Sequence, residues 1–355
     1  MDAAYQKVQD QASQWETAAG ASSGSAADKV TSIKPTANVA ALRDLIADAL
    51  MDGLPPKTHA LYAPAHHHFQ SGGKLLRGIL ALASGLSHGL PQQTALHWSL
   101  AIEYMHNASL VHDDLCDDDV SRRNRPSIWV AFNRPMAICL GDWMIGQSFA
   151  HAAAAQEYAP DSQVSGLLAA TLSTLSTGQA KEFLPNQQLD IAAYSDIVAG
   201  KTTPLFVAAM EGILRLAGQN DTSQIAACQA LFADIGIAYQ IANDMQDHNE
   251  LLADKTDGDL LRDAPNAVYM CYRAGLAAAQ QTDFDTWRAA PDLRADADGM
   301  ANWLGDITAS TAMADAEALM HKHLASVKEH CAALPAEVEQ LILPILKHVA
   351  GHHVS

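Results

Sequence analysis

Apolar residues recur at helical spacing through most of this chain. The pattern is clearest in three segments that alanine and leucine dominate: VAALRDLIADAL (39–50), LLRGILALASGL (75–86) and SGLLAATLSTLSTGQAKEFL (165–184). Alanine has the highest helix propensity, and the period-two alternation of Val, Ile and Thr that marks strands is nearly absent. The sequence therefore predicts an all-α fold.

The chain is long and apolar enough to bury a large core. It has 355 residues, of which 49% are hydrophobic, and this composition excludes a disordered protein. The pattern favours a polar helix over residues 1–18 and a linker over 19–38, where small residues and Pro dominate. We therefore expect an N-terminal helix and flexible linker over 1–38 and one large helical domain over 39–355.

The charge balance restricts the class of partner. Asp and Glu number 40 against 22 Lys and Arg, which gives a formal net charge of −18. Such a chain repels polyanions, so we expect no nucleic-acid partner and no anionic membrane surface. Cations are the favoured ligands.

Cysteine usage and the N-terminus indicate the compartment. The five cysteines are scattered and form no CxxC motif, which argues against a disulfide framework and a zinc site. MDAAYQKVQDQASQWE lacks the pattern of a signal peptide, and no uninterrupted apolar run reaches ~18 residues. We expect a cytoplasmic protein without a membrane span.

A first acidic cluster follows an apolar helical run, in SLVHDDLCDDDVSRRNRP (109–126). On a helix, Asp113 and Asp117 lie one turn apart on one face, with Asp114 beside them. Two carboxylates there repel each other unless a cation lies between them. Oxygen ligands without His or Cys favour Mg²⁺, with Mn²⁺ as an alternative. Taken alone, the cluster also fits a solvated acidic surface turn.

A second cluster ends another apolar run, in YQIANDMQD (239–247). Its oxygen side chains again lie at i, i+1 and i+4, as Asn243, Asp244 and Asp247. Two such helical faces could hold metal ions between them. Basic residues recur beside glycines and aspartates, where they could bind the anion that such metals imply; they are Lys74, Arg77, Arg122, Arg123, Lys201 and Lys255.

These motifs together resemble the trans-isoprenyl diphosphate synthases, the polyprenyl synthetase family. The similarity runs from about Val39 to the C-terminus and includes GGKLLRG, HDDLCD with RRNRP, GKTTPLF, GIAYQIANDMQD and DKTDGDL, in the order of the family. It implies a large helical bundle around a central active-site cavity, usually in a homodimer. It also implies an enzyme that condenses an allylic diphosphate with isopentenyl diphosphate to a longer trans-prenyl diphosphate.

The resemblance implies a metal and allylic diphosphate site. Asp113 and Asp117 would ligate Mg²⁺, with Asp114 supporting them, and the second cluster would complete a set of three ions through Asn243, Asp244 and Asp247. Arg122, Lys201 and Lys255 would neutralise the allylic diphosphate, and Gln240 would donate hydrogen bonds to it. The departed diphosphate, held near Lys201, Thr202 and Gln240, would take the proton that is lost.

The resemblance also implies a separate site for isopentenyl diphosphate, formed by Lys74, Arg77, His106 and Arg123. His106 lies seven positions before Asp113, two helical turns back on the same face, so its spacing supports this role independently. The neighbouring HHHF (66–69) is interpreted only as a polar helix face.

The sequence departs from the family at two places. Asn243 stands where the family usually has Asp, and an amide brings no charge to a metal. After Lys255, GDLLRDAPNA lacks the lysine that usually follows. Three interpretations therefore stay open: a chain-elongating prenyltransferase, a terpene-cyclase-like enzyme that acts on one prenyl diphosphate, and a non-catalytic partner subunit of a prenyltransferase. The intact first motif argues against the last.

Product length would depend on residues that precede Asp113 on its helix. Met105, Ala108 and Ser109 share a face there. Because Ala108 and Ser109 are small, the family analogy implies a product beyond ~15 carbons, with Met105 as a stop near ~20 carbons. Ordinary close packing at small residues explains the same pattern.

Overall fold

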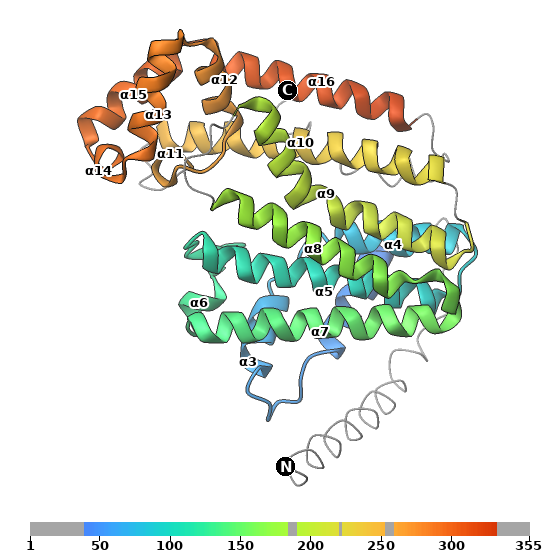
Figure 1. Cartoon of the computed structure of the whole chain (residues 1–355). Coiled ribbons are helices and arrows are strands. Elements are labelled where there is room, and N and C mark those ends of the chain that lie inside the picture. Colours follow the sequence, from blue (N-terminus) through green and yellow to red (C-terminus); the bar gives the residue numbers. More distant parts are fainter. Residues whose placement is uncertain (1–38, 184–189, 220–221, 253–258, 332–355) are drawn as a thin grey trace, which may run out of the picture. The chain divides into compact units, whose positions relative to one another are not determined.

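The part of the chain that the structure describes is almost entirely helical (Figure 1). A computed structural model describes residues 39–183, 190–219, 222–252 and 259–331. The described part contains long helices and a single two-stranded hairpin, so the predicted all-α class is confirmed. The predicted boundary at residue 38 and the predicted N-terminal helix lie outside the described residues. Contacts divide the chain into two compact units, Met1–Ala155 and Gln156–Ser355.

Unit 1 is built around one long buried helix, α5. Pro91 precedes α5. The helix ends at Cys116 with Asp117 as its C-cap, and Asp118 then adopts the left-handed conformation (φ 56°). The side chains of Trp98 and Tyr104 in α5 are fully buried. The elements of unit 1 are α2 (Val39–Asp52), α3 (Tyr62–Phe69), α4 (Leu76–Ser87), α5 (Gln92–Cys116), β1 (Ser121–Arg122), β2 (Arg125–Pro126), α6 (Ile128–Ala131) and α7 (Arg134–Tyr158).

Unit 2 packs its core between long helices and a group of short ones. Figure 1 shows α10 and α16 side by side, and α9 also packs against α10. The elements of unit 2 are η3 (Pro160–Ser162), α8 (Val164–Glu182), α9 (Ile191–Leu216), α10 (Thr222–Leu252), α11 (Asp259–Arg262), α12 (Ala267–Gly275), α13 (Ala278–Ala289), α14 (Pro291–Arg294), α15 (Ala297–Ala309) and α16 (Ala312–Cys331).

Glycines bring α8 and α9 into close contact. A Cβ atom added to Gly178 would lie 2.8 Å from the carbonyl carbon of Gly200 and 3.1 Å from the backbone nitrogen of Lys201. Any side chain at Gly178 would therefore push the two backbones apart. The crossing fixes the position of α9 at Lys201, which the sequence analysis assigns to diphosphate binding.

Two helices of unit 2 are long and apolar enough, by length and composition alone, to cross a membrane. They are α9 and residues 225–252 of α10, and 67% and 50% of their most apolar windows are buried inside the protein. The buried core helix of a globular protein has the same length and composition. This similarity is weak evidence, and the absence of a membrane span stays a prediction.

Candidate active site

The first acidic cluster occupies the C-terminal end of α5. Asp113 and Asp117 are partly exposed, whereas Asp114 is 2% exposed. One oxygen of Asp114 accepts a hydrogen bond from Arg122 Nε at 2.6 Å and forms an ion pair with a terminal guanidinium nitrogen of the same residue at 2.5 Å. Burial raises the pKa of the Asp114 carboxyl, and Arg122 opposes that shift. The buried aspartate is thus paired within the protein, and the two partly exposed ones flank it.

The hairpin after α5 positions the two consecutive arginines. Arg122 ends β1, and Arg123 and Asn124 form the two-residue loop to β2. Both loop residues have positive φ, 53° and 60°, as a type I′ turn requires. Arg122 is thereby directed to Asp114, while Arg123 lies beyond it in the turn.

Arg123 reaches the glycine loop that precedes α4. Its guanidinium donates hydrogen bonds to the carbonyl of Gly72 and, at 3.5 Å, to Ser71 Oγ. A Cβ atom at Gly73 would lie only 3.0 Å from this guanidinium, so any larger residue there would push the Arg123 side chain away. Lys74 follows directly and is exposed. The structure therefore brings Arg123 to the GGK motif, although 49 residues separate Lys74 from it in the chain.

Arg77 and His106 form a direct pair across α4 and α5. A terminal nitrogen of Arg77 lies 3.2 Å from Nε2 of His106. A guanidinium can only donate, so Nε2 accepts and the ring proton is on Nδ1. Burial and the nearby arginines lower the pKa of His106 well below its usual value. Unit 1 thus holds all four residues predicted for isopentenyl diphosphate on three adjoining segments.

The histidines of α3 have a role that the sequence analysis missed. His68 is buried, and its Nε2 lies 2.8 Å from Oδ1 of Asn107 in α5. His67 contacts the hairpin, with Nε2 at 2.9 Å from the Pro126 carbonyl and Nδ1 at 3.1 Å from Arg125. This polar face therefore fixes the hairpin and α5 to α3. The run of three histidines is the only signal in the sequence that could have indicated these contacts.

The second acidic cluster lies on α10 in unit 2. Asp244 is 1% exposed, and its carboxylate accepts hydrogen bonds from Tyr194 Oη at 2.7 Å, the Ala267 backbone nitrogen at 2.7 Å and Gln240 Nε2 at 2.8 Å. Burial and the nearby Asp259 raise the pKa of Asp244 to about 8, against the effect of these donors. The geometry makes Asp244 an anchor between α9, α10 and the start of α12. Its assignment as a metal ligand stays a prediction.

The flanking members of this cluster are more accessible. Asn243 is exposed, and Asp247 is partly buried and accepts a hydrogen bond from the Asp259 backbone nitrogen at 3.1 Å. Asn266 connects the group further, because its side-chain nitrogen lies 2.9 Å from Asp259 Oδ2. The sequence analysis assigned no role to Tyr194, Asp259 or Asn266. Tyr194 lies 50 residues from Asp244 in the chain, whereas Asp259 and Asn266 lie in the DKTDGDL segment and just after it.

The remaining predicted residues of unit 2 lie on two packed helices. Lys201 and Thr202 are on α9, and Gln240 is on α10. A Cβ atom at Gly236 would lie 3.5 Å from the Thr202 methyl group, which places Thr202 about one turn from Gln240 along α10. Lys255 lies outside the described residues.

Two of the three residues predicted to set product length are buried inside unit 1, and Ser109 is half-buried. Met105 and Ala108 are each 1% exposed, and Ser109 donates a hydrogen bond to the His106 carbonyl at 2.8 Å. Burial of this kind agrees with the lining of a narrow tunnel and equally with ordinary packing. Their role in chain length stays a prediction.

The first cluster fits a hard divalent ion that a phosphate also ligates. Among the described residues, no group of three or more His, Cys, Asp or Glu side chains could hold a metal ion alone. Mg²⁺ commonly takes one or two carboxylates and completes its shell with water and substrate phosphates. Asp113 and Asp117, one turn apart and partly exposed, supply such a pair.

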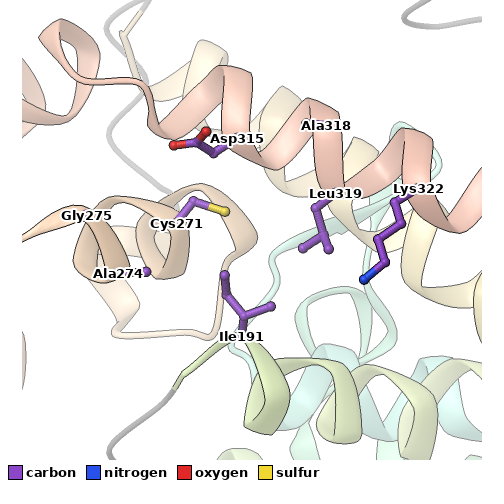
Figure 2. A pocket seen from close by; sticks show the side chains of 8 residues that line it. All are labelled: Ile191, Cys271, Ala274, Gly275, Asp315, Ala318, Leu319 and Lys322. Atoms are coloured by element: carbon purple, nitrogen blue, oxygen red, sulfur yellow. The ribbon is translucent and has the colours of Figure 1, made fainter.

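Each unit contains a cavity. In unit 1, a cavity of about 20 Å³ lies between Asp114, Arg122, His68 and Ser127, room for roughly one water molecule. In unit 2, an open hollow of about 500 Å³ lies between the start of α9, α12 and α16 (Figure 2). None of the predicted site residues within the described ranges lines the hollow. Its lining residues are Ile191, Cys271, Ala274, Gly275, Asp315, Ala318, Leu319 and Lys322.

Solved structures share the fold over most of the chain. A geranylgeranyl pyrophosphate synthase aligns with a TM-score of 0.75 and 19% identity, covering 88% of this chain and 98% of that one. Heptaprenyl diphosphate synthase from Staphylococcus aureus aligns with a TM-score of 0.75 and 21% identity, over 88% and 98%. A polyprenyl synthase from Caulobacter crescentus, crystallised with calcium and isoprenyl diphosphate, aligns with a TM-score of 0.72 and 22% identity, over 89% and 94%.

Sequence relatives are prenyl diphosphate synthases. Geranylgeranyl diphosphate synthase of Sulfolobus acidocaldarius is 30% identical over 212 residues, 58% of this chain and 63% of the relative. A short chain isoprenyl diphosphate synthase of Methanothermobacter thermautotrophicus is 31% identical over 211 residues, 58% and 62% of the two chains. The match thus spans less than two thirds of these relatives.

The family assignment rests on a match to more than half of the chain. Residues 58–270 match the polyprenyl synthetase family, and this range contains every predicted site residue. The resemblance drawn from the motifs is thereby confirmed. The chain belongs to the polyprenyl synthetase family.

Proposed function

We propose that this chain is a Mg²⁺-dependent prenyltransferase that condenses an allylic diphosphate with isopentenyl diphosphate. One observation carries the proposal: unit 1 places Arg123 on the Gly72–Gly73 loop beside Lys74, and pairs Arg77 with His106. Together they form a cationic site suited to a diphosphate. A single-substrate cyclase has no need of this second diphosphate site.

The cations of this site act by binding and orientation. Arg77 and Arg123 provide planar guanidinium groups that can each bind two phosphate oxygens, and Lys74 adds a point charge. The neutral His106 ring keeps Arg77 in place through Nε2. The homoallylic substrate would thus be held by its diphosphate while its double bond stays available to react.

The acidic clusters would hold the metal. Asp113 and Asp117 are the proposed ligands in unit 1, and Asn243 and Asp247 are the proposed ligands in unit 2. When bound, Mg²⁺ supplies positive charge that favours departure of the allylic diphosphate. Three ions per site, with Mn²⁺ as a substitute, remain part of the proposal.

The protein side chains would complete charge stabilisation and exclude water. Arg122, Lys201 and Lys255 are assigned to the leaving diphosphate, whose negative charge grows as the bond breaks. Thr202 and Gln240 would donate hydrogen bonds to it, and its oxygens would accept the proton lost after condensation. The buried Ala and Leu residues of α5 keep the surroundings apolar, which protects an allylic cation from water.

Product length is proposed from the buried face of α5. The small side chains of Ala108 and Ser109 leave room for a chain beyond ~15 carbons, and Met105 would end it near ~20 carbons. The similar proteins named above include geranylgeranyl and heptaprenyl diphosphate synthases, so they leave the length open. A homodimer and a cytoplasmic location are further parts of this proposal.

Asn243 favours one alternative, a cyclase-like enzyme acting on a single prenyl diphosphate. The deciding experiment incubates the purified chain and Mg²⁺ with geranyl or farnesyl diphosphate, with and without isopentenyl diphosphate, and identifies the products by mass spectrometry. Longer prenyl diphosphates formed only with isopentenyl diphosphate are expected. A hydrocarbon or alcohol formed without it would overturn the proposal in favour of the cyclase, and no product in either case would favour a non-catalytic partner subunit.

A further inference from the structure

Glu103 is a buried carboxylate that no sequence motif singled out. It lies on α5, one turn before Asn107, and its side chain is 1% exposed. Removing a carboxylate from water costs several kcal/mol unless hydrogen bonds or opposite charges compensate. The groups that surround Glu103 therefore indicate what it does.

Glu103 caps the first turn of α4 from a neighbouring helix. Its Oε1 accepts a hydrogen bond from the Gly78 backbone nitrogen at 2.7 Å. The first N–H groups of a helix have no partner within the helix, and the residue before α4, Leu75, provides no side-chain cap. A negative charge is also favourable at this end of a helix.

Gly78 is shaped for this contact. A Cβ atom added there would lie 2.7 Å from Glu103 Cγ and 2.9 Å from Ser99 Oγ. Ser99 Oγ donates a hydrogen bond to the Gly78 carbonyl at 3.0 Å. Two residues of α5 thus hold both backbone polar groups of Gly78, and they fix the start of α4.

The held turn carries part of the isopentenyl diphosphate site. Leu75 lies between Lys74 and Arg77 and has φ 51°, a left-handed conformation that non-glycine residues adopt only when their surroundings impose it. The contact of Glu103 with Gly78 comes directly after this segment. It therefore constrains the direction in which Arg77 leaves the backbone toward His106.

Charge connects Glu103 to the same site. The positive charges of Arg77 and Arg123 both act on its carboxylate and lower its pKa, against the larger effect of burial. Both arginines are assigned to one diphosphate.

We propose that Glu103 is the positioning residue of the isopentenyl diphosphate site. By holding Gly78, it orients the segment that carries Lys74 and Arg77. These two cations then face the same diphosphate as His106 and Arg123 do. This inference rests on the proposed function, because its ligand is the homoallylic substrate of that reaction.

The test compares Glu103→Ala with Glu103→Gln in the full-length protein. Glu103→Ala is expected to raise the KM for isopentenyl diphosphate about tenfold, because the cations lose their alignment, and to leave the KM for the allylic diphosphate unchanged. Glu103→Gln keeps an oxygen that can accept from Gly78 and is expected to restore most of the lost affinity. Titration calorimetry with isopentenyl diphosphate alone should show the same order of dissociation constants.

A second variant tests the contact from its other side. Gly78→Ala places a methyl group only 2.7 Å from Glu103 Cγ and so displaces the glutamate, which should reproduce the rise in KM. Combined with Glu103→Ala, it should add little, since both changes remove one contact. This variant also keeps the test decisive if Glu103→Ala does not fold.

Glu211→Gln is the matched control. Glu211 is a buried glutamate of unit 2 that pairs with Arg215 at 2.6 Å, and its replacement should not change binding of isopentenyl diphosphate. Wild-type affinity in both Glu103→Ala and Gly78→Ala, or equal losses for both substrates, would overturn this inference alone. A wild-type protein that does not bind isopentenyl diphosphate would overturn the proposed function and this inference with it.

Discussion

Arg122 binds one carboxylate oxygen of Asp114 through two nitrogens: Nε donates a hydrogen bond at 2.6 Å, and a terminal guanidinium nitrogen forms an ion pair at 2.5 Å. The pair joins the hairpin to the end of α5. Asp244 has the same place in the second cluster, where Tyr194 and the Ala267 backbone nitrogen bind its carboxylate. In both clusters the middle residue anchors the helix, and the residues on either side of it are the more exposed ones.

Loss of Arg122 should destabilise the protein. Arg122→Ala leaves the buried Asp114 without its charged partner, which we expect to lower the free energy of unfolding by about 2 kcal/mol. Arg134→Ala is the control, because the Arg134–Asp118 pair is exposed and should contribute less than about 1 kcal/mol. Urea denaturation measures both. Equal losses in the two variants would contradict the anchoring role.

Asp113→Ala should abolish turnover. The variant loses one of the two carboxylates proposed to hold Mg²⁺ in unit 1, so we expect a fall in kcat of at least about a thousandfold with an unchanged circular dichroism spectrum. Asp161→Ala, an exposed aspartate in η3, is the control for general loss of charge. Near-normal activity in Asp113→Ala would remove the metal role proposed for it.

Spacing predicted these clusters, but it did not reveal the function of each member. The i, i+1, i+4 pattern put Asp113 and Asp117 on one face, and the structure agrees, since the Asp117 backbone nitrogen donates to the Asp113 carbonyl one helical turn earlier. The same pattern does not distinguish Asn243, which is exposed, from Asp244, which is buried. Burial of Asp244 depends on Tyr194, which lies 50 residues away in the chain. Such partners depend on tertiary packing, which local patterns do not encode.

The glycine loop also depends on a tertiary contact that local sequence patterns do not reveal. GGKLLRG identified Lys74 and Arg77 through its resemblance to a family motif, but the contact of Arg123 with Gly72 spans 51 residues. The buried Glu103 escaped notice because a lone glutamate on an apolar helix forms no motif. The role proposed for Glu103 depends on its tertiary contact with the Gly78 backbone nitrogen.

Asn243→Asp should strengthen metal binding. A carboxylate in place of the amide adds a charge at a proposed ligand position, so we expect half-maximal activity at a Mg²⁺ concentration several-fold lower. Gln246→Glu adds the same charge at an exposed position on the same helix and controls for a general electrostatic effect. A Mg²⁺ titration that matches wild type would count against Asn243 as a ligand.

The hairpin turn should show a trade-off between stability and binding. Arg123 and Asn124 both have positive φ, which glycine adopts without strain. Asn124→Gly is expected to stabilise the protein by about 0.5 kcal/mol and to leave the KM for isopentenyl diphosphate unchanged. Arg123→Gly should give similar stabilisation from the turn but raise that KM, since it removes the guanidinium. A rise in KM for both variants would indicate that the turn, rather than the Arg123 side chain, controls binding.

Acid should destabilise the protein through His68. Burial lowers the pKa of His68 from 6.5 to about 4, and the charges of Arg123 and Arg122 add to this effect. Between these two values the unfolded chain binds a proton that the folded protein does not, so stability falls as the pH decreases from 6.5 toward 4. The contribution has an upper limit of about 3 kcal/mol.

Urea denaturation across this range should show a shallower decline for His68→Gln than for wild type, since glutamine does not titrate and can still donate to Asn107. His321→Gln removes an exposed histidine and should follow wild type. Parallel curves for His68→Gln and wild type would show that the His68 ring is not held neutral between α3 and α5.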